Sequence, residues 1–232
     1  MLPKIDLPIF EATLPSTEER IKYRPFTVKE EKILLVAQEA EDASQEMIAA
    51  RQVVNNCMID KDISEISMFD LEYMLLILRS RSVDNKISFN IKDMDTNENI
   101  LLELDIDEIN VERNPEHTKE VKINDTYTLL LKYPSLDDFI KISEMDINDP
   151  LANYYIVISC LDKVVSEDEV HNFADYEQKD VDDFMENVAG DVVQKIQQFF
   201  ATMPKVRHEL KYKNKEGTEK TFMIEGTRTF FI

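Results

Sequence analysis

Glycine is scarce in this sequence, which has only three glycines among 232 residues. Loops that wrap around phosphate groups need closely spaced glycines, because glycine lets the backbone approach a ligand and adopt left-handed conformations. The sequence has no Gly-x-Gly-x-x-Gly, no Walker loop and no Gly-x-Ser-x-Gly turn. These absences argue against nucleotide-binding loops and against the nucleophile turn of serine hydrolases.

Cysteine and histidine are also scarce. Cys57 and Cys160 each lie in an apolar, helix-like context, so we predict no disulfide framework, a reducing compartment and two core thiols. The three histidines, His117, His171 and His208, fall in different predicted elements. None of them has a second histidine or cysteine at metal-ligand spacing, so no zinc site is predicted.

Long apolar runs are missing. The longest, residues 154–161, is far below the ~20 residues that a bilayer span needs. The N-terminal stretch has prolines at positions 3 and 8 with an acidic residue between them, and it lacks the apolar core of a secretion signal. We therefore expect a soluble protein without a membrane span, located in the cytoplasm when it is made.

Basic residues are few: 27 Lys and Arg oppose 47 Asp and Glu, for a net charge of −20. Such a chain repels phosphate backbones and anionic lipids, so we predict no nucleic-acid partner and expect neutral or basic protein partners. The charge is uneven. Residues 204–232 carry +3 and the remainder carries −23, so the C-terminal piece is predicted to be a separate electrostatic unit.

Among the features present, a helix-start signal stands out. Pro25 keeps Arg24 out of the helical region, and Thr27 with Glu30 three residues later forms a capping box. A helix is therefore predicted from Val28, after a short hairpin. Apolar spacing predicts two amphipathic helices in tandem. Their expected buried positions are Val28, Ile33, Leu34, Val36 and Ala37, then Met47, Ile48, Val53 and Val54.

A third helix is predicted from Ser67, with Asp70 at the capping-box position. It is apolar almost all round, which is typical of a central helix or of one covered by a partner subunit. Because desolvated apolar and aromatic side chains dominate interface energies, this helix is the predicted docking face. Its candidate partner-binding residues are Met68, Tyr73 and Leu76.

After Val83 the apolar period changes to two, which predicts β-strands. The predicted strands cover residues 87–91, 100–104, 121–123 and 127–131, with residues 109–111 as a possible fifth. We interpret them as an antiparallel meander. Helices are then predicted from Ser135, from Asp149-Pro150, and over residues 180–185 and 191–200, followed by a hairpin over residues 206–225.

The predicted fold class is therefore α+β: a helical body with an inserted antiparallel β-meander and a C-terminal β-hairpin. We divide the chain into four segments. They are residues 1–83, a hairpin plus three helices; 84–133, the meander; 134–203, helices packing with the N-terminal helices; and 204–232, a basic hairpin arm.

The carboxylate-rich segments are the candidate chemical sites of this sequence. Residues 93–104 place oxygen ligands like a calcium loop, but Glu98 replaces the required glycine and Leu104 replaces the bidentate glutamate, so we predict a solvated hairpin tip. The clusters at 137–138, 167–169 and 180–183 are interpreted as helix starts, where negative charge is stabilising. We predict no catalytic residue, no cofactor and no metal ligand. The alternative is a carboxylate-based metal-binding enzyme.

Several segments together resemble one protein family. They are Met1-Leu2-Pro3-Lys4-Ile5-Asp6-Leu7-Pro8, Arg24-Pro25-Phe26, Val28-Lys29-Glu30-Glu31-Lys32-Ile33-Leu34-Leu35, Val54-Asn55-Asn56-Cys57 and Met68-Phe69-Asp70-Leu71-Glu72-Tyr73. They resemble the baseplate hub proteins of T-even-like contractile-tail bacteriophages, which include the hub subunit and the hub-assembly protein. The resemblance covers about the first eighty residues and returns weakly at residues 199–208.

The resemblance implies a structural or assembly role in a phage tail baseplate, without catalytic residues. As a permanent hub component the protein would be a virion structural protein. As an assembly chaperone it would hold hub or tape-measure proteins during assembly and would be absent from the mature particle. The implied partners are other hub or tape-measure proteins in a hetero-oligomeric assembly. The implied locations are the host cytoplasm during assembly and the virion tail baseplate.

The C-terminal residues Phe230, Phe231 and Ile232 complete the list of candidate contacts. Three exposed apolar side chains would leave surface in water at a cost of ~25 cal/mol per Å². We therefore expect them to contact the acidic body or a neighbouring hub protein.

Overall fold

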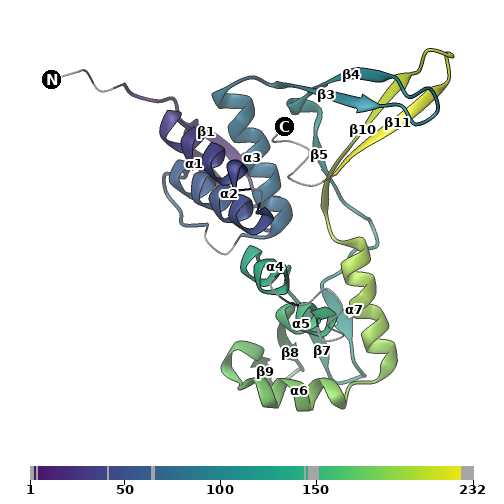
Figure 1. Cartoon of the computed structure of the whole chain (residues 1–232). Helices are drawn as coiled ribbons and strands as arrows, with labels where there is room; N and C mark the ends of the chain where they lie inside the picture. The colour runs from purple at the N-terminus through teal and green to yellow at the C-terminus, as the bar shows by residue number, and fades with distance from the viewer. Residues whose placement is uncertain are drawn as a thin grey trace. The chain divides into compact units, whose positions relative to one another are not determined.

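The fold is described from a computed structural model, which describes Pro3 and residues 5–40, 42–63, 66–143, 145 and 152–225. The chain forms two compact units. Unit 1 comprises residues 1–112 and 205–232, and unit 2 comprises residues 113–204. The α+β class is confirmed, since helices and antiparallel sheets alternate along the chain (Figure 1).

Unit 1 begins with a hairpin of β1 (Phe10–Thr13) and β2 (Arg20–Tyr23). The helices α1 (Val28–Glu39), α2 (Ala43–Cys57) and α3 (Met68–Ser82) follow. The predicted hairpin and the start of α1 at Val28 are confirmed, and the capping box between Thr27 and Glu30 is present. Ser67 caps α3 as predicted, because its side chain accepts a hydrogen bond from the Asp70 amide.

Helix α3 forms the centre of the unit 1 core. Its buried side chains include Leu71, Met74 and Leu78, which are fully enclosed. Cys57 at the end of α2 is also fully buried, and this burial raises the pKa of its thiol to about 11. The predictions of a central third helix and of a core thiol at Cys57 are confirmed.

The predicted buried face of α1 is wrong at two positions. Val28 and Val36 are 65% and 69% exposed, whereas Ala37 is buried. At about 100° per residue, Val28 lies roughly 140° around the helix from Ile33, so the two side chains cannot share one face. The predicted buried positions of α1 therefore do not form a single stripe along the helix. Some of its apolar side chains lie on the solvent-exposed side.

The remaining strands of unit 1 form two sheets. β3 (Lys86–Lys92) pairs with β4 (Asn99–Asp105), and the pairing places Ile87 opposite Leu104. β5 (Asn110–Glu112) pairs with β10 (Lys205–Lys213), which pairs with β11 (Glu219–Glu225). A short helix η1 (Ile106–Glu108) connects β4 to β5. The predicted C-terminal hairpin is β10 and β11.

Unit 2 contains an antiparallel sheet in the order β6 (Glu120–Lys122), β7 (Thr128–Leu131), β8 (Leu161–Val165) and β9 (Val170–Asn172). Its helical elements are α4 (Leu136–Ser143), α5 (Ala152–Ser159), η2 (Phe173–Asp175), α6 (Gln178–Glu186) and α7 (Gly190–Thr202). The predicted cap of α4 is present, with Ser135 and Asp138 exchanging hydrogen bonds. The helix predicted from Asp149-Pro150 begins outside the described residues.

The single meander predicted for residues 87–131 is wrong in its pairing. Its strands exist, but β3 and β4 pair only with each other, β5 joins β10, and β7 pairs with β8. Period-two patterns identify strands without naming their partners. The predicted segment 84–133 thus shares one sheet with segment 204–232 and another with segment 134–203. The predicted packing of residues 134–203 with the N-terminal helices stays a prediction.

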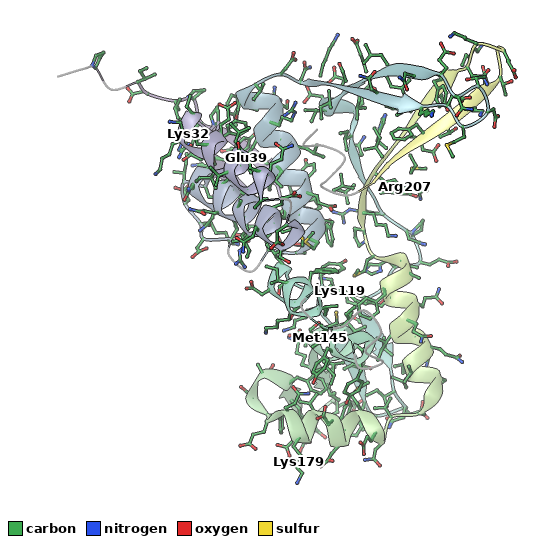
Figure 2. All side chains as sticks on the ribbon, in the orientation of Figure 1. Lys32, Glu39, Lys119, Met145, Lys179 and Arg207 are labelled. Atoms are coloured by element: carbon green, nitrogen blue, oxygen red, sulfur yellow. The ribbon has the colours of Figure 1, made fainter. Side chains whose placement is uncertain are left out.

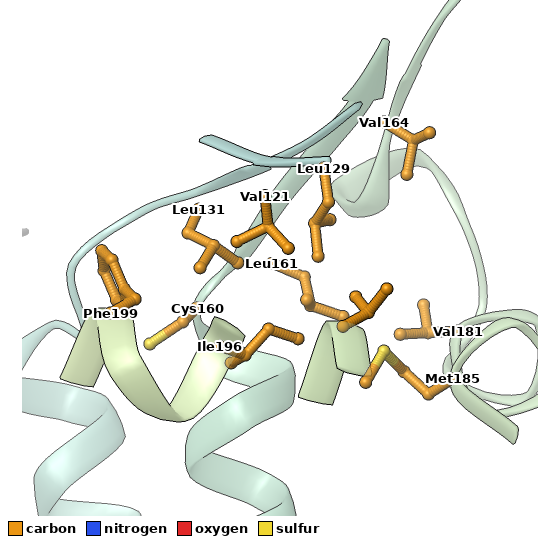
Figure 3. Close-up of a cluster of buried hydrophobic side chains, with 11 residues drawn as sticks. Val121, Leu129, Leu131, Cys160, Leu161, Val164, Val181, Met185, Ile196 and Phe199 are labelled. Atoms are coloured by element: carbon orange, nitrogen blue, oxygen red, sulfur yellow. The ribbon is translucent and has the colours of Figure 1, made fainter. Parts of the chain in front are cut away.

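The unit 2 core lies between this sheet and its helices. Figure 3 shows Leu131 and Val121 of the strands facing Ile196 of α7. Cys160 is fully buried in this cluster, which raises the pKa of its thiol to about 12. The prediction of a core thiol at Cys160 is therefore confirmed too.

A histidine joins the segments where the chain enters and leaves unit 2. The two ring nitrogens of His117 lie 2.9 Å from Thr202 Oγ1 and 2.9 Å from Tyr133 Oη. The ring also packs against Phe199, with 5.2 Å between the ring centroids. Burial and the nearby Lys119 lower the pKa of His117, so the fold favours the neutral imidazole.

Candidate interaction surfaces

The described residues offer no obvious metal or membrane site. Within them, no group of three or more His, Cys, Asp or Glu side chains is arranged to hold a metal ion. The same part of the chain has no helix that is long and apolar enough to cross a bilayer.

The predicted docking face on α3 is largely enclosed. Leu76 is buried at 3% exposure, and Met68 and Tyr73 are half-buried. Tyr73 and Leu76 line a pocket of about 260 Å³ between α3 and η1, together with Tyr23 and Arg81. Leu76 therefore belongs to the core. Phe230, Phe231 and Ile232 lie outside the described residues, so their contacts stay a prediction.

The predicted solvated tip between β3 and β4 is wrong for Asp93, which is fully buried. One carboxylate oxygen accepts hydrogen bonds from the amides of Asp95 and Thr96. The other accepts from Tyr212 Oη at 3.0 Å and pairs with Lys220 Nζ at 3.1 Å. The tip resembles a calcium loop in sequence because the Asp93 side chain closes a turn of the local backbone. The C-terminal hairpin of β10 and β11 covers Asp93.

Electrostatics explains this contact between the hairpins. The Thr96 amide, then Lys220 and Tyr212, hold the pKa of Asp93 well below its usual range despite its burial. Lys220 also pairs with Asp95, and Lys215 lies 2.7 Å from Glu98. Part of the positive charge of the C-terminal hairpin therefore neutralises the acidic tip. We call these contacts the Asp93 lock.

We expect Asp93→Asn to lower the melting temperature and to speed amide exchange in β3, β4, β10 and β11. Asparagine keeps the turn acceptor, but it leaves Lys220 without its buried counter-charge. Glu219→Gln is the matched control, because the Lys213–Glu219 pair on the same hairpin is exposed and such pairs contribute little. Equal effects of the two substitutions, measured by hydrogen exchange and thermal unfolding, would contradict the claim that the Asp93 lock stabilises the two hairpins.

The outer side of α1 is a second surface feature. Val28, Leu35 and Val36 are all more than half exposed. Figure 2 labels Lys32 and Glu39, which belong to the same helix. The helix therefore presents apolar side chains among charged ones, as interface helices often do.

Unit 2 contains a pocket of about 610 Å³ that we call the aromatic groove. It lies among the β6–β7 turn, strands β8 and β9, η2 and helix α6. Apolar and aromatic side chains form most of its lining, and a few polar groups complete it. The lining residues are Ile123, Asn124, Tyr127, Val164, His171, Phe173, Tyr176, Asp180, Val181, Phe184, Asn187 and Val188.

Some residues that line the groove also belong to the unit 2 core. Val164 and Val181 are buried members of that core, and Phe173 packs edge-to-face on Phe184 with 5.4 Å between ring centroids. His171 shares a hydrogen bond with Tyr176 Oη at 2.8 Å and lies 3.2 Å from Glu169. The lining is thus built from packed elements, which makes it a preformed site.

The segment that forms much of this groove is acidic in sequence. Residues 162–191 contain eleven Asp and Glu but only Lys163 and Lys179 as basic residues. The cluster at 167–169 forms the exposed turn between β8 and β9, so its interpretation as a helix start is wrong. Its acidic side chains instead lie beside the strand that carries His171.

Sequence reasoning missed the groove because it missed β8 and β9. The sequence places Cys160 in an apolar, helix-like context, whereas α5 ends at Ser159 and β8 begins at Leu161. The β-branched pair Val164-Val165 was the available signal for a strand.

The family model described as T4 bacteriophage base plate protein matches residues 7–232. No curated protein and no solved structure matches the chain.

Proposed function

Because the chain belongs to the T4 bacteriophage base plate protein family, we propose that it is a structural or assembly protein of the baseplate hub that acts through protein–protein surfaces without catalysis. The observation that carries the proposal is the family match over nearly the whole chain. Its proposed partners are other hub or tape-measure proteins in a hetero-oligomeric assembly. Its proposed locations are the host cytoplasm during assembly and the tail baseplate.

Features of the described surface support a binding role. The exposed apolar residues of α1 and the aromatic groove offer area to bury on association. Met68 and Tyr73, which are half-buried on α3, remain proposed contacts, as do Phe230, Phe231 and Ile232. Leu76 is buried, so it supports the proposed docking face of α3 from the core.

Two roles within the hub are distinguishable by one experiment. Quantitative mass spectrometry of purified virions should detect a permanent hub component at a fixed ratio to known baseplate proteins. A chaperone should instead be absent from virions and should cross-link to hub proteins in infected cells. Absence from virions together with no cross-link to any baseplate protein would overturn the proposal.

A further inference from the structure

We propose that the aromatic groove binds an extended segment of another baseplate protein, in which a large apolar or aromatic side chain is flanked by lysine or arginine. This inference rests on the proposed function and adds the chemistry of the partner.

The size and lining of the groove indicate its central ligand group. About 610 Å³ is within the range of small-ligand pockets and accommodates one or two large side chains. Tyr127 and Tyr176 are 36% and 46% exposed, so their rings are open to a partner. Burying such apolar surface is favourable by ~25 cal/mol per Å². The groove therefore favours an apolar anchor.

The charge around the groove indicates what flanks the anchor. Asp180 lines the groove, and Glu177, Asp183 and Glu186 are exposed along the same helix or at its start. Lys163 is paired with Asp162 at 3.7 Å. Lys179 projects outward from α6 (Figure 2). The local field is negative, so it attracts and orients basic side chains and repels nucleic acid.

The sheet beside the groove favours an extended segment over a small molecule. Within the described residues, β9 is the last strand of its sheet and has a strand neighbour on one side only. Edge strands offer backbone groups to an added strand, with alternate side chains entering pockets. His171 of β9 lines the groove, so a segment lying along β9 would pass the groove with its anchor in reach.

The test selects random displayed peptides on the immobilised full chain and measures the enriched peptides by surface plasmon resonance. We expect the enriched peptides to carry an aromatic or large aliphatic residue with Lys or Arg within a few positions. Tyr127→Ala should weaken their binding by about tenfold, as expected for an aromatic anchor contact. Tyr127→Phe, the matched control, should bind like the unaltered chain. Near-ultraviolet circular dichroism checks that each variant is folded.

Charge is tested separately. Asp180→Lys should slow association and reduce its salt dependence, because exposed charges mainly change encounter rates. Glu116→Lys, an equal change of charge in unit 2 that does not line the groove, should have a smaller effect. A salt-independent association rate would overturn the charge part of the proposal.

The remaining outcomes overturn the whole inference. They are no enrichment over background, enriched peptides without the basic and apolar pattern, or binding that Tyr127→Ala leaves unchanged. Self-association that is lost both in Tyr127→Ala and on deleting residues 226–232 would assign the groove to a second copy of the chain instead. The virion and cross-linking measurements do not depend on the groove, so they still test the proposed function if this inference fails.

Discussion

Replacing Glu30 with alanine should lower the free energy of unfolding by about 3 kcal/mol, the low end of the range for breaking a buried ion pair. The Glu30 side chain is 1% exposed and lies 3.1 Å from Arg24, whose side chain is 28% exposed. The carboxylate also accepts hydrogen bonds from the Thr27 amide and hydroxyl. Its loss would leave Arg24 without its counter-charge and would remove half of the capping box.

The same ion pair connects three parts of unit 1. Arg24 follows β2, Glu30 lies in the first turn of α1, and the Arg24 guanidinium donates to the Asn56 carbonyl near the end of α2. Urea denaturation of Glu30→Ala and of Glu31→Ala measures this contribution. Glu31 is exposed in the same helical turn, so its removal changes mainly the helix-dipole interaction, by about 0.3–1 kcal/mol. Equal losses in the two variants would contradict the role of the buried pair.

The Glu30 ion pair also predicts a dependence on pH. Burial alone would raise the pKa of Glu30, but hydrogen bonds from Arg24 and Thr27 outweigh it and hold the pKa at about 2. Because the unfolded chain binds the proton more tightly, this stabilisation is complete above the ordinary carboxyl pKa of 4.5 and is lost as the pH falls toward 2. Glu30→Ala should therefore show a smaller loss of stability between these pH values than the unaltered chain.

Replacing Phe199 with alanine should destabilise unit 2 by about 3–5 kcal/mol, because it removes a large side chain from a packed core. Phe199 is 2% exposed and belongs to the core cluster of unit 2. Its ring packs against Tyr133 and Phe200 at centroid distances of 5.7 Å and 5.4 Å. Native-state hydrogen exchange should show faster exchange at the core amides of unit 2.

Gln197→Ala is the control for Phe199→Ala, since Gln197 is exposed on the same helix and its replacement should change the stability by less than about 0.5 kcal/mol. A second readout is the pKa of His117, which should move up toward its ordinary value when Phe199 no longer covers the ring. Exchange that becomes equally fast in both units would contradict the assignment of Phe199 to a separate core.

Local features of this fold could be predicted from the sequence. The Thr27 and Ser67 caps, the central position of α3 and the C-terminal hairpin depend on residues within a few positions of one another, and all are found. The caps are short-range hydrogen bonds. The central position of α3 follows from the apolar residues on almost all sides of this helix. The sequence resemblance to the baseplate family also rests mainly on short N-terminal segments.

Long-range features could not be predicted in the same way. Asp93 and Tyr212 are separated by 119 positions, and no local pattern names Lys220 as the counter-charge of a turn aspartate. The pairing of β5 with β10 likewise joins distant segments. The groove combines residues from the β6–β7 turn, the β8–β9 hairpin, η2 and α6, so missing one hairpin was enough to miss the site.

The central claim, that this chain contributes to building the baseplate through its protein surfaces, is tested most directly by counting complete baseplates. Extracts of cells infected with a phage carrying a stop codon in this gene would be examined by negative-stain electron microscopy, with the unaltered protein supplied from a plasmid as the control. We predict few or no complete baseplates without the protein and restored numbers with it. Normal numbers of complete baseplates in its absence would contradict the claim.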